Sequence, residues 1–164
     1  MEIQLVKGVG EGLTKLSAFH AALMDAGVGR LNLIQLSSVV PRETEIKDIG
    51  KLSMPDEEHG YFQYAVYSKQ VSAPKVVSCA GIGWIQYPDN RGYFVEHHGN
   101  SEKDVKQLIK TSLTDMLDKD KDLMAKFHLS KREIKIHNYI VEAKSNDKYS
   151  CAFVGALYKR EKPF

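Results

Sequence analysis

Two adjacent serines, Ser37 and Ser38, form a pair that could carry nucleophilic chemistry. A serine hydroxyl attacks a carbonyl when neighbouring groups activate it or when the peptide beside it is strained. The pair carries little information by itself, because a chain of this length contains about one Ser-Ser dipeptide by chance. Two serines that end a strand and bond to a turn would have the same sequence. The surrounding residues therefore have to decide between these interpretations.

Two triplets, Glu57-Glu58-His59 and Glu96-His97-His98, contain residue types that bind metal ions. Adjacent residues of a strand point to opposite faces, so each triplet supplies at most two ligands to one site. Neither triplet has the helical spacing of two histidines that zinc enzymes use. We therefore predict no metal site and treat His59 as a solvated loop residue. A metal-dependent enzyme that uses Glu96 with His97 or His98 is a weaker hypothesis.

A glycine-rich segment, Gly8 to Gly12, precedes the first predicted helix. Its Gly-x-Gly-x-Gly spacing differs from the dinucleotide-binding fingerprint. Glu11 also stands where a phosphate group needs positive potential. We therefore expect a turn here and no nucleotide site. His20, on the helix that follows, is a lone histidine, and no Ser-His-Asp or Cys-His order accompanies it.

Apolar spacing and turn residues predict the elements that would hold these side chains. A helix is expected from Thr14, its N-cap, to Ala26, and a second amphipathic helix is expected from Ser101 to Leu117. Strands are expected at residues 2–6, 31–38, 61–68, 76–87, 93–97, 134–136 and 149–158. The polar segment 41–60 is expected to form a loop, and residues 118–131 either continue the second helix or form an exposed insertion.

These elements predict one domain, residues 1–164, of the α+β class, built as an αββα-type layered sandwich of mainly antiparallel strands. Hydrophobic residues at 43% and charged residues at 27% are ordinary globular values. The net charge of +2 favours neither nucleic acid nor an anionic membrane as a partner. No apolar run is long enough to span a bilayer and no leader-like start is visible, so we expect a cytoplasmic protein without membrane partners.

The residues around the serine pair resemble a known family. Residues 8–46 read GVGEGLTKLSAFHAALMDAGVGRLNLIQLSSVVPRETEI. This stretch is similar to pyruvoyl-dependent arginine decarboxylases, which carry a glycine-rich loop, an AFDxAL-like helix, an AG(I/V)G stop and NLIxxSSxxP. The order and the spacing match without a gap. Downstream, GYFVEHHG at residues 92–99 and CAFVGALYK at residues 151–159 resemble two further strands of the family.

The resemblance implies that the protein makes its own cofactor, a covalent pyruvoyl group derived from Ser38. The Ser38 hydroxyl would attack the carbonyl of Ser37 and convert the amide to an ester. Asn32 would stabilise the oxyanion of that step. Elimination and hydrolysis would then leave two chains, 1–37 and 38–164, and the longer chain would begin with the pyruvoyl group. A strained peptide at the serine pair would favour the first step.

The resemblance also implies the reaction and the assembly. The pyruvoyl carbonyl would form a Schiff base with a small amino-acid substrate and accept electrons as arginine is converted to agmatine and carbon dioxide. Glu96 would return the proton, in an apolar setting provided by residues 93–95, and Ser37 and His20 would contact the substrate. Family members form trimers, often paired into hexamers, with active sites shared between subunits. A homotrimer or hexamer is therefore expected.

The chain departs from the family pattern at His20, where the family has the aspartate that meets the substrate guanidinium. A charge-assisted hydrogen bond is worth roughly 1.5–3 kcal/mol. Its loss weakens arginine binding by about tenfold to more than a hundredfold. Ornithine or another amino acid is therefore the alternative substrate, and a non-catalytic trimeric relative is the alternative function. The decarboxylase is favoured because Asn32, Ser37, Ser38 and Glu96 are all present.

Overall fold

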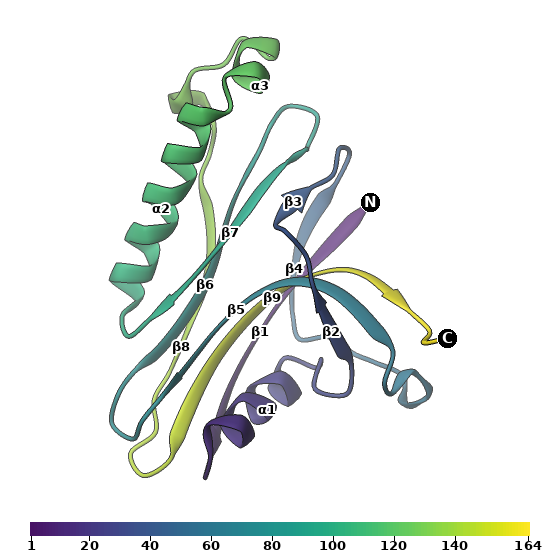
Figure 1. The fold of residues 1–164 in the computed structure, drawn as a ribbon, viewed down its shortest axis with the longest axis vertical. Coiled ribbons are helices and arrows are strands. Elements are labelled where there is room, and N and C mark those ends of the chain that lie inside the picture. Colours follow the sequence, from purple (N-terminus) through teal and green to yellow (C-terminus); the bar gives the residue numbers. More distant parts are fainter.

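The computed structural model describes all residues, 1–164, as two β-sheets with helices packed against them (Figure 1). The strands are β1 (Glu2–Gly12), β2 (Asn32–Gln35), β3 (Val39–Val40), β4 (Glu45–Gly50), β5 (Phe62–Ser72), β6 (Ser78–Gln86), β7 (Gly92–Gly99), β8 (His137–Ala143) and β9 (Tyr149–Glu161). The helices are α1 (Lys15–Asp25), α2 (Glu102–Lys119) and α3 (Lys121–Lys126), with 3-10 turns at η1 (Asp56–Glu58) and η2 (Lys131–Glu133). None of the helices is both long enough and apolar enough to cross a membrane.

The five-stranded sheet has the order β2-β5-β9-β1-β4, and the four-stranded sheet has the order β3-β7-β6-β8. Two pairs at the outer ends of the larger sheet, β1 with β4 and β2 with β5, are parallel. The other pairs are antiparallel. The predicted α+β class, with its mainly antiparallel strands, is therefore confirmed.

Three apolar clusters hold the elements together. One joins α1 to the five-stranded sheet, a second fills the space between the two sheets, and a third joins α2 to the four-stranded sheet. Ala22 and Phe153 belong to the cluster under α1, and Val66 and Phe94 to the cluster between the sheets. Ile85 and Ile109 belong to the cluster under α2. Because strand residues alternate between faces, β5, β7 and β9 each contribute side chains to the cluster between the sheets and to a helix-facing cluster.

The turn expected at Gly8 to Gly12 is wrong, because β1 runs through all of these residues. The glycines are needed for close approach, since α1 lies directly on this part of the strand. A Cβ atom at Gly8 would stand 2.2 Å from the Ala22 carbonyl oxygen, and one at Gly10 would stand 2.4 Å from the Ala22 nitrogen. Thr14 caps α1 as predicted, with its hydroxyl accepting from the Ser17 amide at 3.0 Å.

Two further expectations need correction. The loop expected over residues 41–60 contains β4, whose polar sequence suits the outer strand of a sheet with solvent beside it. The strand expected at 134–136 instead begins at His137 as β8. The second helix begins after Ser101, which caps it, and continues as predicted in one of the two alternatives, through α2 to Lys119 and on into α3.

Candidate active site

The serine pair lies where the chain passes from one sheet to the other. The strand expected over residues 31–38 ends at Gln35, and the chain then enters the four-stranded sheet as β3 (Figure 1). Just before the pair, the Leu36 amide donates to the Ala65 carbonyl of β5 at 3.0 Å. Just after it, the Phe94 amide of β7 donates to the Ser38 carbonyl at 2.8 Å. The peptide between the two serines is therefore held from both sheets.

Ser38 has a left-handed backbone conformation, with φ at 49°. This region is unfavourable for a residue with a Cβ atom, and such residues gather at functional sites. The conformation agrees with the expectation that a strained peptide at this pair would favour the first step of self-cleavage. Ser37 is exposed and Ser38 is half-buried, so the bond between them lies at the edge of the space between the sheets.

Glu96, on β7, contacts Ser38, the residue just before β3. The Ser38 hydroxyl donates a hydrogen bond to Glu96 Oε1. The sequence prediction of an apolar setting holds only in part, because β7 alternates. Phe94 belongs to the cluster between the sheets, on the face that carries Glu96, whereas Tyr93 and Val95 pack toward α2. Glu96 is half-buried.

Tyr158, near the end of β9, belongs to the same region and was missed in the sequence. Its hydroxyl donates to the Val39 carbonyl at 2.9 Å, one residue after Ser38. Burial, together with the nearby negative charge of Glu96, raises the pKa of the Tyr158 phenol. The available signal was the alternation of the last strand, which places Tyr158 on the same face as Val154 and Ala156, toward the other sheet.

Asn32 and His20 are not joined to the Ser38–Glu96 pair within one chain. Asn32 begins β2 and is exposed, and its side-chain amide donates to the Gly60 carbonyl at 2.8 Å. His20 is exposed on α1, which covers the face of the five-stranded sheet opposite to the one that faces Glu96. The predicted roles of these two residues therefore stay predictions.

The acidic and histidine triplets have other contacts. His97 Nε2 lies 2.7 Å from the Ser112 hydroxyl of α2, and burial lowers the pKa of His97. His98 Nδ1 lies 2.7 Å from Gln70 Oε1, on the opposite face of β7. Glu58 pairs with Arg160 at 2.9 Å. No group of three or more histidine, cysteine, aspartate or glutamate side chains is arranged to hold a metal ion.

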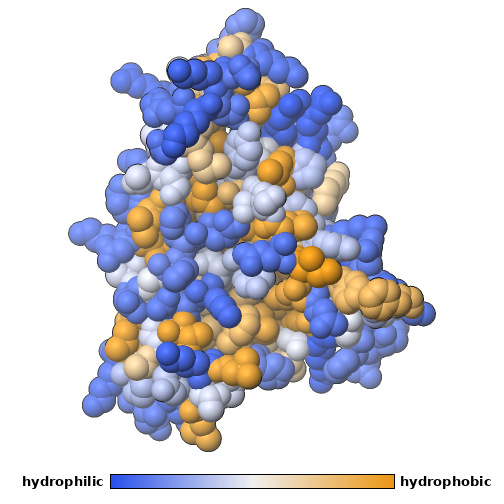
Figure 2. All heavy atoms as spheres, viewed as in Figure 1, coloured by the Kyte–Doolittle hydropathy of each residue, from blue (hydrophilic) through white to orange (hydrophobic).

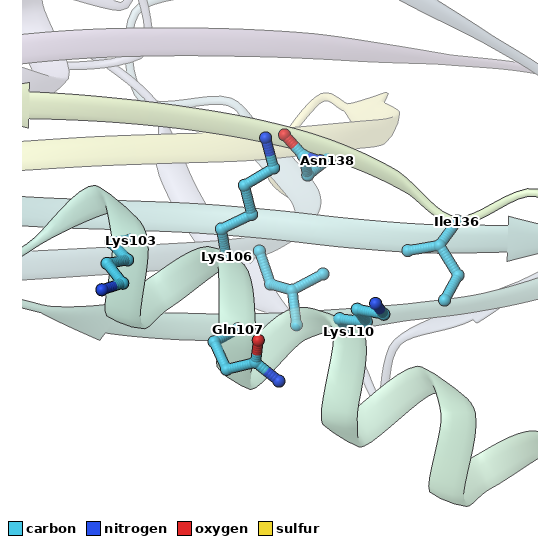
Figure 3. A pocket seen from close by; sticks show the side chains of 7 residues that line it. Lys103, Lys106, Gln107, Lys110, Ile136 and Asn138 are labelled. Carbon is cyan, nitrogen blue, oxygen red and sulfur yellow. The ribbon is translucent and has the colours of Figure 1, made fainter.

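A separate pocket of about 380 Å³ lies between α2 and β8 (Figure 3). It is lined by Lys103, Lys106, Gln107, Ile109, Lys110, Ile136 and Asn138. Figure 3 shows Lys106 extending from α2 toward Asn138 on β8. None of the predicted site residues lines this pocket, which therefore does not belong to the Ser38–Glu96 site.

Comparison with known proteins assigns the chain to a family. The family model described as pyruvoyl-dependent arginine decarboxylase matches residues 2–163. The chain belongs to this family. The covalent pyruvoyl cofactor that gives the family its name fits the residues present, because Ser38 combines a strained backbone with a hydroxyl directed at a carboxylate.

Among curated members, a pyruvoyl-dependent arginine decarboxylase of Methanopyrus kandleri is 42% identical over 82 residues, which are 50% of this chain and 51% of that protein. The pyruvoyl-dependent arginine decarboxylase 2 of Archaeoglobus fulgidus is 30% identical over 118 residues, 71% of this chain and 75% of the relative. The Methanocaldococcus jannaschii decarboxylase is 39% identical over 89 residues, 49% of this chain and 54% of the relative. The match to the first of these relatives spans about half of its length.

Proposed function

We propose that this chain is an autoprocessed, pyruvoyl-dependent amino-acid decarboxylase whose favoured substrate is arginine. The observation that carries the proposal is the left-handed Ser38, whose hydroxyl donates to Glu96. Membership of the family and the names of the matched relatives support the same reaction. The proposal covers one domain, residues 1–164, processed into chains 1–37 and 38–164.

In the processing reaction, the Ser38 hydroxyl oxygen attacks the carbonyl carbon of Ser37, and Glu96 orients this hydroxyl and receives its proton. As the bond from that carbon to the Ser38 nitrogen breaks, the nitrogen takes up this proton and becomes an amine, so an ester replaces the amide. Loss of the Cα proton of residue 38 and cleavage of its Cβ–oxygen bond then free the Ser37 carboxylate. Water replaces the nitrogen of residue 38, which leaves as ammonia, and a keto group remains at the start of the longer chain.

During turnover, the pyruvoyl group supplies a carbonyl that binds the substrate amine and accepts the electrons released as carbon dioxide leaves. The residues of the chain would hold the substrate and move the proton. Glu96, freed from the Ser38 hydroxyl, stands where it can return a proton to the substrate Cα. Ser37, now at the end of the shorter chain, borders the same space and is proposed to contact the substrate.

We propose that the layered domain forms a trimer in which neighbouring copies share the active site. His20 lies on the opposite face of the five-stranded sheet from Glu96, so it reaches a substrate only at the site of another copy. Exposed apolar side chains, Leu13, Leu16 and Val39, are available for subunit contacts. Figure 2 shows hydrophilic side chains over the end that carries α3 and more apolar ones over the sheets.

The choice of substrate depends on His20, where an imidazole stands in place of the acid that the family pattern has. A neutral imidazole accepts one hydrogen bond from a guanidinium, whereas a protonated imidazole repels it. Ornithine or another amino acid is therefore the alternative substrate for the same chemistry.

Carbon dioxide release from a panel of labelled arginine, ornithine, lysine, aspartate and glutamate tests this function. The processed wild-type protein should release carbon dioxide from arginine faster than from the others, and Ser38→Ala should release none. A fully processed protein that releases carbon dioxide from no amino acid would contradict the decarboxylase. Release from another amino acid alone would keep the reaction and replace the substrate.

A further inference from the structure

The hydroxyl of Tyr158 is the only side-chain hydroxyl that reaches the strand leaving the serine pair. It donates to the Val39 carbonyl at 2.9 Å from β9, across the space between the sheets. Strand β3 stands at the outer end of its sheet and has β7 as its single neighbour. Val39 therefore has no strand partner on its other side, and Tyr158 supplies the hydrogen bond that a strand would otherwise provide.

Besides the β3–β7 ladder, three hydrogen bonds hold the backbone around the peptide to be cleaved. The first is donated by Leu36 to Ala65, and the second by Phe94 to the Ser38 carbonyl. The third is the bond from Tyr158 to Val39. The first bond lies two residues before the left-handed Ser38, the second is accepted by Ser38 itself, and the third lies one residue after it. A strained conformation persists only where its surroundings hold it, and Tyr158 is the one side chain among these three donors.

The surroundings of Tyr158 keep it in the role of a donor. Burial and the charge of Glu96 raise the pKa of its phenol, so the hydroxyl keeps its proton at neutral pH. The ring packs edge-on against Phe94, with ring centres 6.3 Å apart. The ring and its hydroxyl are therefore fixed by separate contacts, and the hydroxyl can be removed while the packing stays.

We infer that Tyr158 is a positioning residue for self-cleavage, which holds Val39 so that the Ser38 hydroxyl stays close to the Ser37 carbonyl. This inference rests on the proposed function, because it assumes that the bond between Ser37 and Ser38 is cleaved. Tyr158 touches neither reacting atom. Its loss should slow the formation of chains 1–37 and 38–164 without preventing it.

The test follows cleavage of the full chain, made by cell-free translation with a pulse of label, in the wild type and in Tyr158→Phe. Loss of one neutral hydrogen bond should slow cleavage roughly three- to tenfold. Tyr67→Phe is the matched control, because Tyr67 packs on Phe153 on the helix-facing side of β5 and its hydroxyl has no hydrogen bond to protein. This control should cleave at the wild-type rate.

Restoring a hydrogen-bond donor at position 158 distinguishes a positioning role of the hydroxyl from a role of the ring in packing alone. Replacing Tyr158 by 4-aminophenylalanine keeps an N–H donor, whereas 4-methylphenylalanine keeps the size without a donor. The variant with 4-aminophenylalanine should cleave close to the wild-type rate, and the variant with 4-methylphenylalanine should cleave as slowly as Tyr158→Phe. If Tyr158→Phe fails to fold, the comparison of these two analogues still tests whether the donor matters.

If the wild type cleaves, two results would overturn the role of Tyr158. One is equal cleavage rates for the two analogues, and the other is a wild-type cleavage rate for a folded Tyr158→Phe. A wild type that never cleaves would overturn the proposed function and this inference together.

Discussion

Serines in the space between the two sheets differ in the group that accepts a hydrogen bond from their hydroxyl. Ser68, Ser72 and Ser78 lie on β5 and β6, are buried and donate to backbone carbonyls, with distances of 2.6, 3.1 and 3.0 Å. Ser38 is only half-buried, lies between β2 and β3 and donates to the Glu96 carboxylate. Ser38 has a left-handed backbone, which none of the other three has.

Burial and residue type alone do not distinguish the serine that we propose to be reactive, because the three buried serines share both features. A carbonyl oxygen that accepts from a serine hydroxyl satisfies it and does not take up its proton. A carboxylate can take up that proton, and a strained peptide lowers the barrier to attack on its carbonyl. Ser38 alone among these serines combines the two features, and this is the reason that we place the cleavage there.

The largest effect expected from this comparison is that of Ser38→Ala. Without the hydroxyl no ester forms, so the variant should remain a single chain of 164 residues with no decarboxylase activity. Intact mass measures the first result and carbon dioxide release the second. The matched change Ser78→Ala removes a buried serine of the same layer and should still cleave. A cleaved Ser38→Ala would mean that another residue is the nucleophile.

Glu96→Gln should have the next largest effect. Proton transfer by a positioned side chain contributes on the order of 10²–10⁴-fold to a rate, so the processed variant should lose turnover by a factor in this range. Turnover per cleaved chain is the quantity to measure, because Glu96 also contacts Ser38 before cleavage. Glu57→Gln, an exposed acid of the other triplet, is the control. Unchanged turnover in Glu96→Gln would remove the proton-donor role.

Asn32→Ala separates two roles for one amide. If the Asn32 amide donates to the oxyanion, its removal should slow self-cleavage by a factor on the order of 10²–10³. As a partner of the Gly60 carbonyl alone it should be worth about 1 kcal/mol of stability and leave the cleavage rate unchanged. Cleavage kinetics and the denaturant midpoint, measured on the same preparation, distinguish these roles. A normal cleavage rate would contradict the oxyanion assignment.

His20→Asp should give the smallest effect of these substitutions, and it is a gain. An acid at this position should lower the KM for arginine by about tenfold or more, since one charge-assisted hydrogen bond is restored. Because His20 is exposed on α1, the substitution should not unfold the protein. Steady-state kinetics with arginine and ornithine measure the change. If both KM values stay the same, His20 does not contact the substrate side chain.

The contact between Ser38 and Glu96 could be predicted because short motifs carry it. A serine pair at a strand end and a glutamate in an alternating strand are local features, and the family pattern joins them. The contact between Tyr158 and Val39 could not be predicted, because the two residues are 119 apart in sequence. The alternation of β9 indicates the face on which Tyr158 lies, but not its partner.

The strand content was underestimated for two physical reasons. Glycines are poor strand formers, so Gly8 to Gly12 read as a turn, although β1 needs them because α1 lies on its backbone. The outer strand β4 has charged residues on its exposed positions and only Ile46 and Ile49 as apolar ones, so it read as a loop. In both segments tertiary contacts decide the structure.

The most direct test of the central claim is the mass of the purified full chain combined with the sequence of its new N-terminus. The account predicts two chains, residues 1–37 with a free carboxylate and residues 38–164 with a blocked N-terminus that becomes lactyl on treatment with borohydride. A single intact chain with serine at position 38, after prolonged incubation of folded protein, would contradict it.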